Sequence, residues 1–367
     1  MLLFKGPRDQ ILAPLQSVCG IVEKRHTLPI LSNVLMEMDG GRLTLLATDI
    51  EIQIRTGTAS AGPEKAALTV GARKLQDILR SLPDTAEVSL NLDEKRLQVK
   101  AGKSRFNLQT LPAEDFPRMA AADGQTAKIS LTQRQFKRLL ALVQYAMAQQ
   151  DIRYYLNGLL LVVNGSEMRV VATDGHRLAY ASEEIGGNHQ RLEVILPRKT
   201  VLELSRQLAD NDDPLEITLA PTQARFHFGD IEFVTKLIDG KFPDYERVIP
   251  QSHGKVIQLG RDALLHSLLR AAILTNEKFR GVRLVLGPGS LKIISNNAEQ
   301  EEAQEELEID YDGEAIDVGF NVTYLLDVLN NVSAESMECR LADANSSALF
   351  VLPGNERFKY VVMPMRI

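Results

Sequence analysis

The sequence predicts an α+β fold made of three similar domains. A strand, a Gly-containing turn and a second strand recur at a spacing of about 125 residues, starting at Leu31, Leu156 and Phe279. Apolar residues alternate along these segments, as in strands with one buried face. Helix-period segments stand between them, and no long strand–helix–strand crossover pattern is present. This combination favours antiparallel sheets covered by helices.

Each copy carries two helix segments, one before the strand pair and one after it. We expect the first helices at 8–23, 133–148 and 261–276, and the second helices at 72–82, 197–208 and 321–331. Further strands follow and end at FNLQTLP, FVTKLID and YVVMPMR. A repeat of this length is a whole domain and not a stacked solenoid unit. We therefore expect domains at 1–125, 126–252 and 253–367.

The composition limits the function. The 367 residues have a formal net charge of −6, which argues against holding nucleic acid by bulk electrostatics. No apolar run approaches the roughly 20 residues that span a bilayer, and no secretory h-region is present, so we expect a cytoplasmic protein. Cys19 and Cys339 lie far apart in apolar surroundings, which indicates buried, reduced thiols and not a disulfide or a zinc site.

The stretch ATDGHRLAY places Asp174, His176 and Arg177 close together, which suggests a catalytic site. A hydrolase that uses Asp174 and His176 is one hypothesis. However, ATDIEIQI from Ala47 repeats the pattern without the histidine and arginine, and no nucleophile motif accompanies it. A structural turn held by the aspartate is the favoured interpretation. GKSRF, from Gly102, lacks the first glycine of a phosphate-binding loop.

Charge is unevenly distributed. The six helix segments contain twelve Lys or Arg and six Asp or Glu, so that the rest of the chain is acidic. Amphipathic helices often carry such an excess, but its repetition in every copy could form one positive surface. Six touching spheres of domain size, each of radius roughly 18 Å, form a ring around a hole roughly 36 Å across. A DNA duplex is about 20 Å wide and would fit this hole. One chain could not encircle DNA, but two could.

Six stretches in order resemble one family over essentially the whole chain: TLPIL from Thr27, ATDGHRLA, FPDYERV from Phe242, NEKFRGVRL from Asn276, FNVTYLLDVL from Phe320 and the final YVVMPMRI. The chain resembles bacterial DNA polymerase III beta subunits, the DNA sliding clamps. The resemblance implies a head-to-tail homodimeric ring of six domains that encircles duplex DNA and acts as a processivity factor. It implies no catalytic residues, cofactor or metal. Gly71 and Ile367 depart from the family's usual Pro and Leu.

The resemblance also implies a groove that binds short apolar peptides of partner proteins. These partners would be the polymerase III alpha subunit, the clamp loader delta subunit, translesion polymerases, mismatch-repair proteins and DNA ligase. The groove residues would be Arg153, Leu156, Thr173, Gly175, His176, Arg177, Leu178, Pro243, Arg247, Val248, Phe279, Asn321, Tyr324, Ser347, Val361, Val362, Met363, Pro364, Met365 and Arg366. Flexible methionines would suit several different peptides.

Two further sites are implied. DNA contacts would come from Arg25, Arg73, Gln150, Tyr154, Tyr155, Arg198 and Lys199. The ring joint would place Lys74, Lys103, Arg105, Phe106 and Leu108 of one copy against Ile273, Leu274, Glu299, Glu301 and Glu302 of the other. Opposite charges there would fix the orientation. A peptide-binding adaptor that does not encircle DNA is the alternative.

Overall fold

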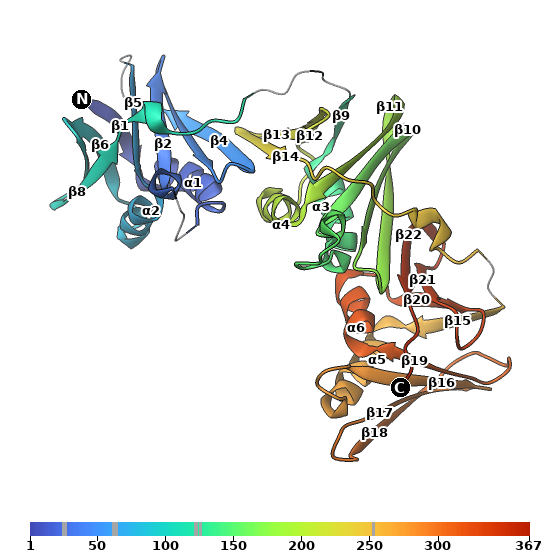
Figure 1. Cartoon of the computed structure of the whole chain (residues 1–367). Coiled ribbons are helices and arrows are strands. Elements are labelled where there is room, and N and C mark those ends of the chain that lie inside the picture. The colour runs from blue at the N-terminus through green and yellow to red at the C-terminus, as the bar shows by residue number, and fades with distance from the viewer. Residues whose placement is uncertain (24–27, 61–64, 121–123, 125–126, 252–253) are drawn as a thin grey trace. The chain divides into compact units, whose positions relative to one another are not determined.

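The structure, a computed structural model, describes residues 1–23, 28–60, 65–120, 124, 127–251 and 254–367. Two compact units result, Met1–Arg134 with Leu202–Leu237, and Gln135–Val201 with Ile238–Ile367. Along the chain one plan occurs three times: a strand, a helix, a group of strands, a second helix and three more strands (Figure 1). The predicted α+β class, with two helices in each of three copies, is confirmed.

The first copy consists of β1 (Leu2–Pro7), α1 (Arg8–Cys19), β2 (Asn33–Asp39), β3 (Arg42–Thr48), β4 (Ile52–Ala59), β5 (Ala66–Gly71), α2 (Ala72–Ser81), β6 (Glu87–Asp93), β7 (Arg96–Ala101) and β8 (Ser104–Leu111). The second consists of β9 (Ala127–Thr132), α3 (Gln133–Val143), β10 (Gly158–Thr173), β11 (Arg177–Pro197), α4 (Arg198–Gln207), β12 (Pro214–Leu219), β13 (Gln223–Phe228) and β14 (Ile231–Lys236). Strands β10 and β11 are long because each covers two strands of the first copy.

The third copy consists of β15 (Lys255–Gly260), α5 (Arg261–Ala271), β16 (Gly281–Gly287), β17 (Ser290–Asn296), β18 (Glu302–Glu308), β19 (Ile316–Asn321), α6 (Val322–Asn331), β20 (Ser336–Leu341), β21 (Ala348–Leu352) and β22 (Asn355–Val362). The first helices end earlier than expected. Helix α1 stops before Gly20, which disfavours a helix interior. Helices α3 and α5 tighten into 3-10 turns at Gln144–Ala146 and Ala272–Leu274.

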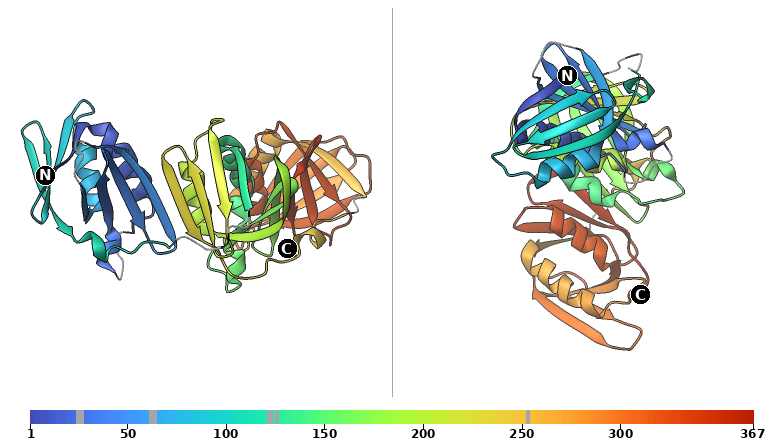
Figure 2. Two further views of the ribbon diagram at one scale, coloured as in Figure 1. Left: turned by 90° about the horizontal axis from the view of Figure 1, so that it is seen from above. Right: turned by 90° about the vertical axis from the view of Figure 1, so that its left-hand side faces the viewer.

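Apolar residues at helical spacing bury one face of each helix. On α1 the side chains of Ile11, Leu15 and Val18 are fully buried, and on α2 those of Leu75 and Leu79 are. The two helices pack on each other, and Figure 2 shows them in blue among the strands of the first copy. Each buried side chain of this size contributes roughly 2 kcal/mol. Replacing Leu15 by Ala would cost about 2–5 kcal/mol because a cavity would remain.

Strand pairing joins neighbouring copies within each unit. In the first unit the sheet order is β1-β6-β7-β8-β5-β2-β3-β4-β14-β13-β12-β9, so that β4 pairs with β14 of the next copy. In the second unit the six-stranded sheet has the order β10-β11-β22-β21-β20-β15, and β11 pairs with β22. A four-stranded sheet, β18-β17-β16-β19, completes that unit. All these pairings are antiparallel, as predicted.

The two seams use the same register. Ile54 of β4 lies opposite Phe233, and Ala179 of β11 lies opposite Tyr360. Ile54 and Ala179 occupy equivalent places in the repeated ATD segments. The first and second copies, and the second and third copies, are therefore joined by antiparallel strand pairs with the same register.

Both cysteines are buried and free, which confirms that prediction. Burial raises the pKa of each thiol to about 12, which keeps it protonated near neutral pH. Among the described residues, no helix is both long enough and apolar enough to cross a membrane.

Candidate functional site

The turn at Thr173 to Arg177 is held by its own side chains. The Thr173 hydroxyl donates to the carbonyl oxygen of Arg177 at 2.6 Å and accepts from the N–H of Gly175 at 3.1 Å. Asp174 Oδ1 accepts from the N–H groups of His176 and Arg177 at 2.9 and 3.1 Å. Both side chains thereby satisfy the turn's backbone, as in Asx and Ser/Thr turns.

The first copy repeats this turn bond for bond. Thr48 Oγ1 donates to the carbonyl oxygen of Ile52 at 2.8 Å and accepts from the N–H of Ile50 at 3.0 Å. Asp49 Oδ1 accepts from the N–H groups of Glu51 and Ile52 at 3.0 and 2.6 Å. The same bonds occur without a histidine, so the aspartate serves the turn. The structural interpretation of ATDGHRLAY is confirmed.

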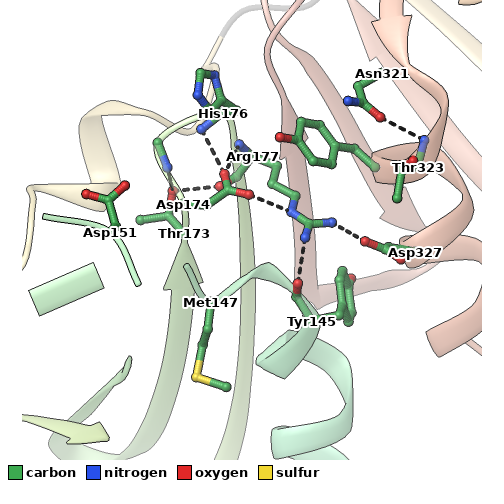
Figure 3. A network of polar contacts seen from close by, with 12 residues as sticks. Tyr145, Met147, Asp151, Thr173, Asp174, His176, Arg177, Asn321, Thr323 and Asp327 are labelled. Atoms are coloured by element: carbon green, nitrogen blue, oxygen red, sulfur yellow. Dashed lines mark hydrogen bonds and ion pairs between the residues drawn. The ribbon is translucent and has the colours of Figure 1, made fainter. Parts of the chain in front are cut away.

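Arg177 links this turn to the third copy. Its Nε donates to Asp174 Oδ2 at 3.1 Å, its Nη1 pairs with Asp327 of α6, and its Nη2 donates to the carbonyl oxygen of Tyr145 at 2.7 Å (Figure 3). The guanidinium lies 4.5 Å from the ring centroid of Tyr324. Its side chain is only 9% exposed. Three acceptors satisfy this buried cation, which thereby links the start of β11 to the 3-10 turn after α3 and to α6.

A second arginine fixes the loop beside the turn. Arg153 pairs with Asp151 through Nη2 at 2.8 Å and donates to the carbonyl oxygen of Asp174 at 3.1 Å. Its side-chain and backbone hydrogen bonds lower the pKa of Asp151 to about 2. Gly175 has φ of 91°, and a Cβ there would lie 2.9 Å from Arg153 Nη1. Only glycine combines this backbone with such a close guanidinium.

A mostly apolar pocket opens next to the two arginines and encloses about 210 Å³. Its walls come from the Arg153 loop, the turn, the segment after β14 and the end of β22. The lining residues are Arg153, Leu156, Thr173, Gly175, His176, Arg177, Leu178, Phe242, Pro243, Tyr245, Val248, Val361 and Met363. Met363 is 47% exposed and Val248 is 43% exposed, so apolar surface faces solvent at the rim. An apolar pocket with a few fixed polar groups is typical of a binding site.

Sequence reasoning missed two lining residues, Phe242 and Tyr245. Both lie in the FPDYERV stretch, where an apolar residue before a proline was the available signal. The other expected groove residues lie outside the pocket lining: Arg247, Phe279, Asn321, Tyr324, Ser347, Val362, Pro364, Met365 and Arg366.

Several of these outlying residues have structural roles. Asn321 caps α6 by accepting from the N–H of Thr323 at 2.9 Å. Val362 is buried in β22, and the N–H of Met365 donates to the carbonyl oxygen of Gly319 at 2.8 Å. Phe279, by contrast, is 57% exposed. The peptide-binding role of the set remains a prediction.

The residues expected to contact DNA fall in different places. Gln150, Tyr154 and Tyr155 share one loop, and the two tyrosine rings meet edge to face at 5.8 Å. Arg73 Nη2 donates to the carbonyl oxygen of Val22 at 2.5 Å. Arg198 Nη1 donates to the carbonyl oxygen of Met147 at 3.3 Å, while Lys199 is half-buried. Arg25 lies outside the described residues.

Several of the helix arginines bind carboxylates or carbonyl oxygens within the chain. Fewer of them are therefore available for the positive surface expected from the sequence. Arg8 binds Asp84 and the carbonyl oxygen of Leu82, just past α2. Arg134 binds Asp210 and Arg261 binds the carbonyl oxygen of Leu329. Arginines at the starts of the first helices therefore hold the ends of the second helices, where carbonyl groups and the helix dipole favour a cation.

The residues expected at the ring joint lie on open strand edges and exposed helix faces. Strand β8 pairs with β7 along its length but with β5 only at Thr110 and Leu111, and β18 is an edge of its sheet. Lys74, Lys103, Arg105, Glu299, Glu301 and Glu302 are exposed, and Phe106, Leu108 and Leu274 are half-buried. Ile273 is 77% exposed. The role of these residues at a ring joint remains a prediction.

Among the described residues, no group of three or more His, Cys, Asp or Glu side chains could hold a metal ion. Both carboxylate oxygens of Asp174 accept hydrogen bonds within the turn and from Arg177. His176 lines the pocket beside it. Asp174 is therefore engaged in the turn and with Arg177.

Comparisons with known proteins identify the family of the chain. Models of the DNA polymerase III beta subunit match at residues 2–120 for the N-terminal domain, 130–244 for the central domain and 246–366 for the C-terminal domain. A beta sliding clamp of Pseudomonas putida is 48% identical over 366 residues, which are 99% of this chain and 100% of the relative. One of Escherichia coli K12 is 46% identical over 365 residues, with the same shares covered.

A crystal structure of the DNA polymerase sliding clamp from Pseudomonas aeruginosa superposes with a TM-score of 0.96 at 46% identity, covering 100% of both chains. The fold and the relatives define a non-catalytic clamp of DNA replication. The chain belongs to the DNA polymerase III beta subunit family.

Proposed function

We propose that two copies of the chain close head to tail into a ring of six domains around duplex DNA, and that the pocket tethers polymerases to this ring. The clamp acts as the processivity factor of the replicative polymerase and has no turnover of its own. The observation that carries the proposal is the repeated seam. Each copy is joined to the next by the same strand pairing. Among the described residues, β18 of the third copy is an edge strand, and β8 of the first copy pairs with β5 only at Thr110 and Leu111.

The repeat predicts how those open edges meet. Strand β18 occupies the place of β4 and β11, and β8 occupies the place of β14 and β22. Ala303 stands where Ile54 and Ala179 stand, because each lies opposite the same position of the preceding strand. By the register of the two seams, Ala303 of one copy pairs with Phe106 of the other. In this register Lys103 lies opposite Glu306, and Arg105 lies opposite Gln304 with Glu302 and Glu306 on either side. These opposite charges fix the direction.

Helix exposure supports the same joint. In α4, Glu203 is 8% exposed, because it lies against Gly20 at the first seam. The equivalent residue of α2, Asp77, is exposed, as is Lys74 on the same helix. Ile273 after α5 is likewise uncovered. A second copy would cover both faces and would leave no open edge.

The pocket suits a short apolar peptide. Leu156, Leu178 and Val361 form apolar walls, and Met363 provides a flexible, polarisable rim that adapts to different side chains. The partners we propose for it are the polymerase III alpha subunit, the clamp loader delta subunit, translesion polymerases, mismatch-repair proteins and DNA ligase. They would compete for one pocket per protomer.

Enclosure explains how a chain of net charge −6 retains DNA. Within a ring, contacts to phosphates can be weak and independent of base sequence, which permits sliding. Tyr154 is 59% exposed and offers a ring on which a single-stranded base could stack. We propose that the ring acts in the cytoplasm, at the nucleoid during replication.

Topology tests the proposal. The protein is loaded onto a nicked circular plasmid by a clamp loader and ATP and then passed through a sizing column. We expect it to remain with the circle and to leave after the plasmid is cut once. An adaptor that does not encircle DNA would behave alike on both forms, and that result would refute the ring.

The joint is tested separately by placing a charge at Ile273 or Leu274. Sedimentation should then report monomers, while pocket-binding peptides keep their affinity. High salt should loosen the dimer only partly, because apolar contacts persist. A tight dimer of the charged variant would contradict this joint.

A further inference from the structure

An acidic residue occupies the same position in the second helix of every copy. Asp77, Glu203 and Asp327 each stand six residues after the residue that precedes the helix, namely Gly71, Pro197 and Asn321. Two of these acids lie at the seams inside the chain, and their contacts show what the position does.

At the first seam the acid faces the end of α1. Glu203 forms an ion pair with Arg206 of its own helix. Its Oε1 also accepts from Gln207 Nε2 at 2.7 Å, and the same nitrogen donates to the carbonyl oxygen of Ser17 at 2.7 Å. A Cβ on Gly20 would lie 2.3 Å from Glu203 Oε1. The carboxylate therefore lies against Gly20, twelve positions after the start of α1, and is linked through Gln207 to Ser17, nine positions after it.

At the second seam the acid reaches the end of α3. Asp327 pairs with Arg177, which also donates to the carbonyl oxygen of Tyr145 at 2.7 Å. Tyr145 follows the start of α3 by twelve residues, as Gly20 follows the start of α1. Twice, then, the acid of a second helix is linked to the end of the first helix in the preceding copy.

The equivalent residues of the third joint are all uncovered. Nine and twelve positions after the start of α5 stand Arg270, whose side chain is 57% exposed, and Ile273, which is 77% exposed. Arg270 Nε donates to Glu305 Oε1 at 2.9 Å and Nη2 to Ser267 Oγ at 3.2 Å. Within the described part of the chain its Nη1 has no hydrogen-bond acceptor. Asp77 is exposed on α2.

We propose that Asp77 of one copy forms an ion pair with Arg270 of the second copy. The inference rests on the head-to-tail ring proposed above and adds a specific contact between helices to its strand seam. Arg270 of the second copy then lies between two carboxylates, Asp77 of the first copy and its own Glu305. On α2 the cations Lys74 and Arg80 flank Asp77, so the joint alternates in charge. Such a pattern disfavours joining two like faces.

A double-mutant cycle on the full-length protein tests the pair. The dimer dissociation constant is measured by sedimentation at low salt for Asp77→Asn, Arg270→Gln and both together. We expect each single change to weaken the dimer about tenfold, as removal of a close interfacial charge pair does. The double change should weaken it no more than either one. The charge swap Asp77→Arg with Arg270→Glu should bind more tightly than either of its single reversals.

Additive losses in the cycle, together with no recovery in the swap, would overturn the inference. Glu87→Arg is the matched control, because it reverses an exposed acid of the same domain away from α2. It should leave the dimer unchanged. A wild-type protein that stays monomeric at all concentrations would instead refute the ring itself. Circular dichroism of each variant separates a lost contact from a lost fold.

Discussion

The N–H of Met363 donates to the carbonyl oxygen of His176 at 3.0 Å. This bond continues the β11–β22 seam into the pocket and sets the rim residue beside the turn. The first seam contains its counterpart, in which the N–H of Lys236 donates to the carbonyl oxygen of Glu51 at 2.9 Å. The pocket wall is thus part of the joint between copies, and its shape follows from the joint.

Replacing Met363 by Glu should weaken binding of a partner peptide about 50-fold. The change removes roughly 2 kcal/mol of apolar contact and puts a charge at the rim. A fluorescence titration with a labelled apolar peptide measures this. Val256→Glu, at a residue that is 49% exposed on β15, is the control and should have no effect. Equal affinities for both variants would contradict the groove.

Ile50→Asn should stabilise the protein by about 1 kcal/mol. Ile50 has φ of 70°, a left-handed backbone that a β-branched residue adopts at a cost and that Asn tolerates. Its side chain is 43% exposed, so little burial is lost. Thermal unfolding of this variant is compared with that of Ile152→Asn, where the side chain is 96% exposed and φ is not positive. A lower melting temperature for Ile50→Asn would argue against strain.

Arg177→Lys should lower the free energy of unfolding by about 2–4 kcal/mol. A lysine cannot reach Asp174, Asp327 and the Tyr145 carbonyl together, so a partly buried carboxylate loses its partner. Denaturant unfolding measures the loss. Arg283→Lys alters a pair with Asp317 that is about half exposed on both sides, and it should cost well under about 1 kcal/mol. A similar loss of unfolding free energy for both changes would show that Arg177 does not hold these elements together.

The Asp151–Arg153 contact should persist to low pH. Because the pKa of Asp151 is lowered to about 2, its contribution to stability is complete above the unfolded value near 4. That contribution is lost as the pH falls through about 2. A carboxyl NMR titration should find this low midpoint, and Arg153→Met should raise it toward the ordinary range. An unshifted midpoint in the unmodified protein would contradict the contact.

Much of the fold follows from local patterns. Helix spacing located the helices α1 to α6 of the described residues, since apolar faces such as Ile11, Leu15 and Val18 recur in step with the helical turn. The repeated ATD segment identified the turn as structural, because Asx bonding depends only on neighbours in sequence. The lengths of β10 and β11 were not predictable, because a strand's end depends on what pairs beside it.

The candidate site was less predictable for the same reason. Arg8 looks like a free cation on a helix, yet Asp84 and the carbonyl oxygen of Leu82, far along the chain, engage it. Tyr245 lines the pocket because the segment after β14 crosses β11. The ring centroids of Tyr245 and of Tyr180 on β11 are 6.1 Å apart. Long-range contacts of this kind leave no periodic signal in the sequence.

The seam between β4 and β14 also bears on how the polypeptide would respond to being cut. Strand β4 pairs with β14 from Arg55 opposite Glu232 to Ile52 opposite Thr235. This pairing holds the first copy to the second independently of the segment of chain between β8 and β9. A protease that nicks this segment should therefore release no fragment until a denaturant is added. The first copy and the remaining two copies, expressed as separate fragments, should also reassemble. The seam would then be a natural site for a split-protein reporter.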